Sequence, residues 1–414
     1  MGLGSYDIAV VGGGIIGLAT AMALRRQNPG LSLVVVEKES RVGLHQTGHN
    51  SGVMHAGLYY TPGSQKANFC ATGARMLRRF CDERGIDYRM CGKVVVALDE
   101  SQLPGLEELF RRGTANGAEG LKMVGRERLR ELEPHAAGIK AIHSPNTGVV
   151  DYNQVTDAFA DEVRGSDGEL LTDARLTGVV ESDGRLVLET TRGDLSASSL
   201  INCAGLQADS VARTMGVDAG VRIIPFRGEY FSLRPERTGL VRGLIYPVPD
   251  PKLPFLGVHF TRRIDGSVEA GPNAVLALAR EGYSKTAVEV HQLLEMARFP
   301  GFWRMSAMNW KTGVRETYRS LVKRRFVKSL QALVPDVRSQ DLWEPGAGVR
   351  AQAVGRDGRL LQDFSIVSTR NAMHVLNAPS PGATSSLAIG EHIAGMAAES
   401  FSLSGPIATG GGPP

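Results

Sequence analysis

The sequence predicts an α/β fold, α+β overall, in which a Rossmann-like unit is combined with an antiparallel sheet. Two patterns indicate this class. The first forty residues contain a strand, a glycine-rich turn, a helix and a second strand, which is the order of a parallel βαβ unit. From residue 221 onward, apolar residues alternate along longer segments, as is typical of antiparallel strands. At about 150 residues per domain, a chain of 414 residues has room for two or three domains.

The predicted elements follow in order along the chain. Residues 7–11 and 31–36 are short β-branched runs of the kind buried in a parallel sheet, and residues 18–26 between them have a helical pattern. Further strands are expected at 94–98, 170–172, 186–191, 196–203, 223–233 and 255–260. Further helices are expected at 103–116, from 151 onward, over most of 285–335, and at 384–401.

A dinucleotide-binding motif lies in the first unit. Gly12, Gly14 and Gly17 have the GxGxxG spacing between strand and helix, and Glu37 ends the second strand. Gly12 permits a tight turn, Gly14 lets the backbone approach a pyrophosphate, and Gly17 lets the helix pack on the sheet. The helix N-terminus attracts phosphates, and Glu37 can accept a hydrogen bond from a ribose 2′-hydroxyl. By itself, this motif does not distinguish FAD from NAD.

The composition argues against several other classes of protein. A net charge of +4 is too small to indicate nucleic-acid binding. Cys70, Cys81, Cys91 and Cys203 form no CxxC pair and lack metal-site spacing, which predicts reduced thiols in a cytoplasmic protein without a metal. The longest apolar stretch, 8–24, is shorter than the roughly 20 residues of a membrane span and contains the glycine motif. We therefore expect neither a membrane span nor a targeting segment.

The sequence that follows Glu37 resembles a known group of enzymes. Residues 45–60 are HQTGHNSGVMHAGLYY. An acidic residue followed by a Thr-Gly and Asn-Ser-Gly loop resembles the D-amino-acid-oxidase-like superfamily of FAD enzymes, and this particular string resembles the L-2-hydroxyglutarate dehydrogenase/oxidase family. Further blocks that resemble this family lie in order at 91–96, 146–152, 203–206, 225–230, 246–249, 254–261, 271–274, 348–352 and 377–386.

The resemblance implies FAD as the cofactor and a chain that passes repeatedly between two domains. The implied FAD-binding domain comprises 1–92, 146–220 and 344–402, the substrate domain comprises 93–145 and 221–343, and 403–414 is expected to be a disordered tail. The implied cofactor-binding residues belong to the glycine turn, the loop after the second strand, an adenine contact and the turn before the last helix. They are Gly12, Gly14, Ile15, Ile16, Gly17, Glu37, Lys38, Thr47, Gly48, Asn50, Ser51, Leu176, Ala204, Gly205, Gly382, Ala383 and Thr384.

The implied reaction is oxidation of L-2-hydroxyglutarate to 2-oxoglutarate, with hydride transfer from C2 to flavin N5. A base must take the hydroxyl proton. His55 is the first candidate, because an imidazole with a pKa near about 6.5 can be neutral at cellular pH. His259, on a predicted strand over the site, is the second candidate, and the choice between them stays open. His45 and His49 are expected to structure the loop.

A dicarboxylate substrate requires cations and hydrogen-bond donors. The superfamily resemblance implies that Arg350 either forms a bidentate contact with a carboxylate or contacts the flavin. Arg227 is a second candidate, although an arginine at a strand edge often forms an ion pair between domains. Tyr59 and Tyr60 could supply hydroxyl groups to the far carboxylate of the substrate or serve in packing. Ser385 is a further candidate for substrate binding.

The partners of the reaction are less defined. Electrons are expected to pass to quinone or another acceptor. Residues 299–328 mix aromatic and basic side chains, and this segment is either a helix that covers the substrate domain or a peripheral contact with the inner face of the cell membrane. Two alternative functions stay open. The same scaffold could oxidise another substrate, such as a different 2-hydroxy acid, glycerol 3-phosphate or an amino acid. Alternatively, the chain could be a non-enzymatic FAD-binding module or an RNA-modifying module. Oligomeric state and covalent attachment of the flavin stay open.

Overall fold

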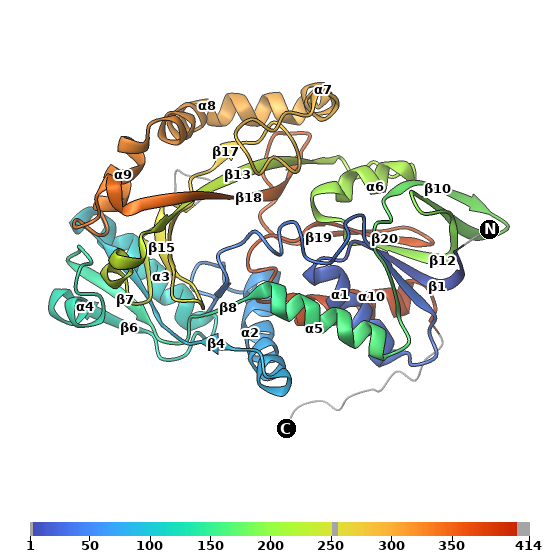
Figure 1. The fold of residues 1–414 in the computed structure, drawn as a ribbon, viewed down its shortest axis with the longest axis horizontal. Helices are drawn as coiled ribbons and strands as arrows, with labels where there is room; N and C mark the ends of the chain where they lie inside the picture. Colours follow the sequence, from blue (N-terminus) through green and yellow to red (C-terminus); the bar gives the residue numbers. More distant parts are fainter. Residues whose placement is uncertain (1–2, 251–255, 404–414) are drawn as a thin grey trace.

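A computed structural model describes residues 3–250 and 256–403 (Figure 1). The predicted tail from 404 onward and the start of the predicted strand at 255–260 lie outside the described residues. The described chain forms two large sheets and a three-stranded sheet. In Figure 1 the first sheet is at the right and the second at the left. The predicted combination of a Rossmann-like unit with an antiparallel sheet is confirmed.

The first sheet contains the parallel βαβ unit. Its strand order is β10-β11-β12-β1-β2-β9, with β20 beside β12 and β19 beside β20. β1 pairs in parallel with β2, to which α1 joins it, and it also pairs in parallel with β12. The strands are β1 (Ser5–Val11), β2 (Leu33–Val36), β9 (Glu169–Leu171), β10 (Leu176–Ser182), β11 (Arg185–Thr190), β12 (Leu195–Asn202), β19 (Ser365–Ser368) and β20 (Ala372–Asn377).

Helices cover both faces of this sheet. α1 (Ile15–Gln27) packs against α5 (Tyr152–Gly165) and α10 (Ser386–Ser400), and α10 also packs against α2 (Gln65–Arg84). Gly390 allows the close crossing of α1 and α10, since a Cβ at this position would lie 2.6 Å from the backbone of Ala19. α6 (Ala208–Thr214) lies on the opposite face (Figure 1).

The second sheet has the order β17-β13-β16-β15-β14-β5-β7-β6, with β18 paired to β13. Every pair is antiparallel except β14 with β5. Its strands are β5 (Lys93–Ala97), β6 (Lys122–Gly125), β7 (Lys140–Ser144), β13 (Val221–Leu233), β14 (Leu244–Pro247), β15 (His259–Arg262), β16 (Val268–Gly271), β17 (Val275–Leu276) and β18 (Leu342–Gly355).

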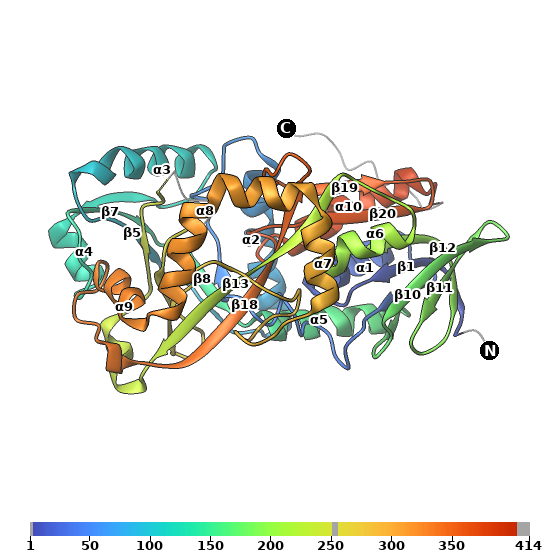
Figure 2. The ribbon, with the colours of Figure 1, turned by 90° about the horizontal axis from the view of Figure 1, so that it is seen from above.

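The remaining elements connect or cover the sheets. α7 (Val290–Arg298), α8 (Pro300–Leu321) and α9 (Lys323–Gln331) form an outer layer beside β13 and β18 (Figure 2). The small sheet joins β3 (Val53–Met54), β8 (Gly148–Val150) and β4 (Tyr88–Arg89). The other helices are α3 (Leu103–Ala115), α4 (Arg126–Leu132) and the 3-10 turns η1 (Glu100–Gln102), η2 (Gly205–Gln207), η3 (Pro235–Leu240) and η4 (Ser339–Asp341). Among the described residues, no helix is both long and apolar enough to cross a bilayer.

Two local expectations differ from the structure. β15 begins at His259, so residues 256–258 precede the strand instead of belonging to it. The FAD-binding domain was expected to resume at residue 344, but β18 pairs with β13 of the second sheet from Leu342 to Gly355, and the next strand of the first sheet is β19. Strand periodicity alone does not reveal which sheet a strand joins, because the pairing partner is distant in sequence.

Candidate active site

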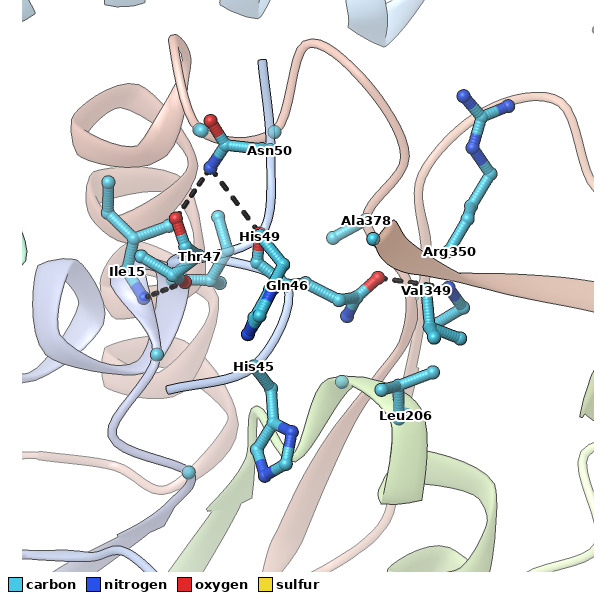
Figure 3. Close-up of a pocket in the computed structure, with 18 of the residues that line it drawn as sticks. Ile15, His45, Gln46, Thr47, His49, Asn50, Leu206, Val349, Arg350 and Ala378 are labelled. Carbon is cyan, nitrogen blue, oxygen red and sulfur yellow. Dashed lines mark hydrogen bonds between the residues drawn. The ribbon is translucent and has the colours of Figure 1, made fainter. Parts of the chain in front are cut away.

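A cavity of about 550 Å³ is bordered by both large sheets. The carboxyl ends of β1 and β2, where α/β folds place their ligands, form one part of its lining. Side chains of β13, β15 and β18 form another part. All of the predicted cofactor residues border this cavity except Gly17 and Gly48. Figure 3 shows the loop 45–50 beside the start of α1, with Val349 and Arg350 across the cavity.

The glycine turn is a cradle that side chains would fill. Gly12 has φ +111°, and a Cβ there would lie 2.5 Å from the carbonyl oxygen of Cys203. A Cβ on Gly17 would lie 2.0 Å from the carbonyl oxygen of Gly12. Gly14 caps α1 without a side-chain hydrogen bond, so the helix N-terminus faces the cavity with backbone groups available to an anion. These features fit a pyrophosphate.

Glu37 is fixed at the end of β2. Its carboxylate accepts hydrogen bonds from the N–H of Gly13 at 2.7 Å and of Glu39 at 2.9 Å. The side chain is buried yet borders the cavity. A carboxylate has about four lone-pair positions, so two backbone contacts leave acceptors for ribose hydroxyls.

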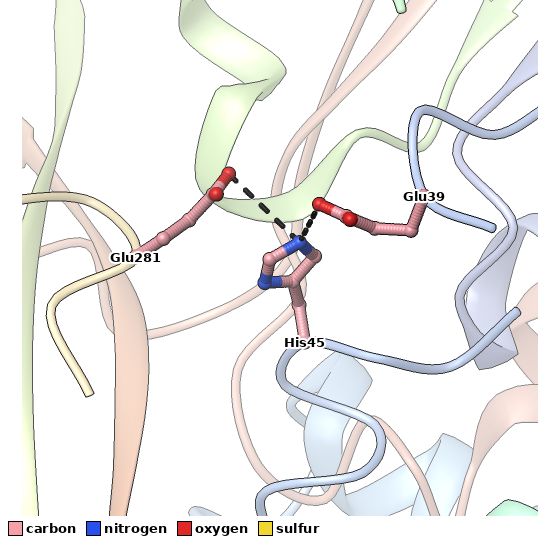
Figure 4. A group of neighbouring side chains, drawn as sticks. All are labelled: Glu39, His45 and Glu281. Carbon is pink, nitrogen blue, oxygen red and sulfur yellow. Dashed lines mark hydrogen bonds and ion pairs between the residues drawn. The ribbon is translucent and has the colours of Figure 1, made fainter. Parts of the chain in front are cut away.

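The loop after β2 is fastened by an ionic cluster (Figure 4). His45 Nε2 lies 2.9 Å from a carboxylate oxygen of Glu39 and 3.9 Å from one of Glu281. This spacing would suit a metal ion, but the ammonium of Lys38 contacts Glu39 and lies 2.9 Å from Glu281. The hydrogen bond from Lys38 lowers the pKa of Glu39. A lysine therefore bridges the two carboxylates at this point and links the loop to the segment after β17.

Gln46 and Thr47 position the rest of this loop. Thr47 Oγ1 accepts a hydrogen bond from the N–H of Ile15 at 3.1 Å, and the Asn50 side chain donates to the Thr47 carbonyl at 2.6 Å. Gln46 Oε1 accepts from the N–H of Ala351 at 2.9 Å (Figure 3). Gln46 was not among the predicted site residues, because its partner on β18 is about three hundred residues away in the sequence.

His55 borders the cavity beside the turn that precedes α10. Its backbone N–H donates to Thr384 Oγ1 at 3.1 Å, and its Nε2 lies 3.4 Å from Ser380 Oγ. Its Nδ1 is buried without a hydrogen-bond partner among the described residues. Burial lowers the pKa of His55 to about 3, and the charge of Lys93 acts in the same direction. The imidazole is therefore neutral at physiological pH and able to accept a proton.

His259 also borders the cavity, and its tautomer is defined by a backbone contact. Its Nδ1 lies 2.9 Å from the carbonyl oxygen of Gly257, so Nδ1 carries the proton and Nε2 carries the lone pair. The ring packs on Tyr246 at a centroid distance of 3.9 Å. Burial lowers the pKa of His259 to about 4, with further contributions from Lys93 and Arg350.

Arg350 and Arg227 lie on opposite faces of the second sheet. Arg350 borders the cavity from β18, together with Phe226, Gly228 and Tyr230 from β13. Since side chains alternate along a strand, Arg227 lies on the other face of β13. It is buried there, 3.1 Å from a carboxylate oxygen of Glu229, and it donates to the carbonyl of Ser284 at 2.9 Å. Arg227 therefore forms an ion pair, as one interpretation predicted, but its partner lies on the same strand and not in the other domain.

The other predicted substrate residues do not border the cavity. Ser385 is fully buried at the start of α10, where the backbone of Gly73 on α2 comes close to it. Tyr60 is hydrogen-bonded to Ser380. The hydroxyl of Tyr59 is buried without a partner among the described residues, and its ring contacts Lys93. Lys93 was not predicted as a site residue, although a lysine next to an apolar run at 94–97 was a visible signal.

Comparison with known proteins gives a consistent picture. A family model described as FAD dependent oxidoreductase matches residues 7–396. The chain is 47% identical over 397 residues to an L-2-hydroxyglutarate dehydrogenase of Indibacter alkaliphilus, covering 96% of this chain and 100% of the relative. It is 46% identical to that of Escherichia coli K12, covering 94% and 92%, and 42% identical to the mitochondrial enzyme of Homo sapiens, covering 96% and 90%.

Solved structures with the same fold have much lower sequence identity. L-alpha-glycerophosphate oxidase from Mycoplasma pneumoniae, with FAD bound, aligns with a TM-score of 0.79 at 21% identity over 97% of each chain. Glycine oxidase from Geobacillus kaustophilus aligns with a TM-score of 0.70 at 19% identity, covering 98% of this chain and 97% of the other. These similarities establish the fold.

Proposed function

The chain belongs to the FAD dependent oxidoreductase family and, within it, to the L-2-hydroxyglutarate dehydrogenases, and from this premise we propose that it oxidises L-2-hydroxyglutarate to 2-oxoglutarate. The observation that supports this reaction most is the pair of neutral histidines that face one cavity with an arginine. These side chains offer a proton acceptor for the substrate hydroxyl and a cation for its carboxylate, next to the residues that would hold a dinucleotide.

FAD fits the residues that border the cavity. The glycine turn and the N-terminus of α1 would hold the pyrophosphate, and Glu37 would accept from the ribose. The turn from Ser380 to Thr384, just before α10, would place backbone N–H groups near the flavin. When bound, FAD supplies the acceptor for the hydride that leaves C2 of the substrate.

The protein's own residues handle the proton and the charge. We propose that His55 accepts the proton of the substrate hydroxyl. Its neutral ring borders the cavity, and its Nδ1 has no partner in the described part of the chain. His259 is the second candidate, since its Nε2 is the free acceptor. Arg350 binds the carboxylate next to the reacting carbon through its planar fork of donors.

Anaerobic reduction of the purified yellow holoenzyme tests the reaction. L-2-Hydroxyglutarate should bleach the flavin absorbance, whereas the D enantiomer and L-lactate should leave it unchanged. Bleaching by L-lactate alone would contradict the proposed substrate. Bleaching by glycerol 3-phosphate or an amino acid would instead support the alternative substrates of this scaffold.

We further propose that electrons leave to a quinone at an anionic membrane surface to which α8 binds. Trp303, Trp310, Val314 and Leu321 are at least 59% exposed. At about 3.6 residues per turn they lie on one line along the helix. The segment 299–328 has eight basic residues and a single acidic one, Glu316. An exposed apolar stripe with basic neighbours is the composition of an interfacial helix.

Vesicle flotation tests this second proposal. The holoenzyme should float with phosphatidylglycerol-containing vesicles and less with pure phosphatidylcholine. Exchange of Trp303 and Trp310 for serine should weaken binding at least tenfold. Met308→Ser is the matched control, because Met308 is 64% exposed on another side of α8. Unchanged flotation of the tryptophan double variant would rule out this surface.

A further inference from the structure

Lys93 is a buried cation on the second sheet. It is the first residue of β5 and is only 1% exposed. Its ammonium lies 4.9 Å from the ring centroid of Tyr59 and 4.9 Å from that of Tyr246. Within the described ranges, no carboxylate lies at ion-pair distance from it. A buried charge without a counter-ion is costly, so its presence requires an explanation.

The surroundings of Lys93 connect it to the reacting groups. Tyr246, which it contacts through one face, packs on the ring of His259. The charge of Lys93 acts on both His55 and His259, and His259 also experiences the charge of Arg350. Lys93 therefore lies close enough to act electrostatically on both histidines, although its own side chain does not line the cavity, and His259 lies within the electrostatic range of both cations.

Negative groups nearby are already neutralised. Glu269, whose charge acts on Tyr230 and Tyr246, forms an ion pair with Arg263 at 3.2 Å. The phenols of Tyr59 and Tyr246 have pKa values raised by burial, so they carry no charge at neutral pH. The region around Lys93 is consequently positive, and a single carboxylate bound by Arg350 would leave the charge of Lys93 uncompensated.

We infer that Lys93 is a specificity-determining residue, which supplies the positive potential for the second carboxylate of a dicarboxylate substrate while Arg350 binds the first. This inference rests on the proposed function and deepens it. A monocarboxylate 2-hydroxy acid of the same length would meet the same histidines and Arg350. It would lack the group that Lys93 attracts.

A comparison of two substrates tests the inference. L-2-Hydroxyglutarate and L-2-hydroxypentanoate differ only in a distal carboxylate or methyl group. Lys93→Met should lower kcat/KM for the dicarboxylate at least 30-fold. The same variant should change kcat/KM for the monocarboxylate less than threefold. Lys93→Arg should retain most of the preference for the dicarboxylate. Lys140→Met, on the neighbouring β7, removes an equal charge from the same sheet and should change neither value. Equal losses on both substrates would overturn the inference.

A binding measurement separates this inference from the proposed function. Glutarate and pentanoate are titrated into oxidised holoenzyme, and the perturbation of the flavin spectrum gives each Kd. The wild-type protein should prefer glutarate at least tenfold, and Lys93→Met should remove this preference. If L-2-hydroxyglutarate failed to reduce the flavin while the preference depended on Lys93, the proposed reaction would fail and the subsite would stand. No preference in the wild-type protein would overturn the subsite.

The wild-type enzyme provides a test if the methionine variant does not fold. Burial lowers the pKa of Lys93 to about 8. His55 and His259 titrate near 3 and 4, burial raises the pKa of Cys70 to about 12, and the pKa values of Cys91, Tyr59 and Tyr246 are also raised. The ratio of kcat/KM for dicarboxylate over monocarboxylate should therefore fall at least tenfold between pH 7 and pH 9.5. A constant ratio would overturn the inference.

Discussion

At the scale of single residues, the cavity holds two imidazoles that burial keeps neutral at physiological pH. His55 and His259 both have lowered pKa values, in each case mainly because burial disfavours the charged ring. Their contacts differ, however. The Gly257 carbonyl fixes the tautomer of His259, whereas Nδ1 of His55 has no partner among the described residues. A proton acceptor and an orienting residue can thus be distinguished by mutation.

We expect His55→Ala to retain FAD, because the contact of residue 55 with Thr384 is made by the backbone. Anaerobic flavin reduction by L-2-hydroxyglutarate, followed by stopped-flow absorbance, should slow by about 100-fold, the usual scale for losing a general base. His143→Ala on β7 is the control and should react normally. Near-normal reduction in His55→Ala, with a large loss in His259→Ala, would transfer the role to His259.

The pH dependence follows from the lowered pKa values. A base works in its unprotonated form, so its activity is present above its pKa and is lost as the pH falls through it. Because the pKa of His259 is lowered to about 4 and that of His55 to about 3, kcat/KM should stay constant from pH 7.5 down to about pH 5. A decline of kcat/KM centred near pH 6.5, measured with the monocarboxylate substrate, would contradict the lowered pKa values of the two histidines.

At the scale of elements, strand register decides which charged residues meet. β13 places Phe226, Gly228 and Tyr230 toward the cavity, and the intervening Arg227 and Glu229 point away from it. The motif around Arg227 was recognisable in the sequence, but the side chain's direction depends on the pairing of β13 with β17 and β18. One residue of shift would exchange the two faces.

Arg227→Met should therefore act on stability more than on substrate binding. Removing Arg227 leaves Glu229 with the half-exposed Lys285, 3.6 Å away, in place of a buried partner, which costs about 3 kcal/mol. Chemical denaturation should show this loss, while KM for L-2-hydroxyglutarate should change less than threefold in the folded protein. Arg350→Met should show the reverse, with a large rise in KM. A large rise in KM in both variants would place Arg227 in the substrate site.

At the scale of the whole molecule, the cofactor cavity joins the two sheets. Its lining combines the glycine turn of the first sheet with β13 and β18 of the second, and Gln46 and Lys38 link the same regions through direct contacts. A ligand that contacts both sheets stabilises the folded arrangement, because it binds the native chain and not the unfolded one.

We expect FAD to raise the thermal unfolding midpoint of the apoprotein. At a free concentration one thousand times Kd, the stabilisation is about 4 kcal/mol. Gly12→Ala should reduce the shift strongly, since its Cβ would collide with the Cys203 carbonyl. Gly30→Ala, where a Cβ has no neighbour within 4 Å, should retain the shift. Differential scanning calorimetry with added FAD measures both, and an undiminished shift in Gly12→Ala would contradict the role of the turn.

The sequence by itself determined the βαβ unit, the glycine turn with Glu37, several of the later strands and helices, and the family, although it did not indicate α2. These features depend on residues that are neighbours in the chain, where spacing fixes periodicity and turn geometry. Tertiary structure alone decided that β18 joins the second sheet, that Arg227 pairs with Glu229, and that the charge of Lys93 acts on His55 and His259. The physical reason is that register, burial and charge compensation arise between segments far apart in sequence.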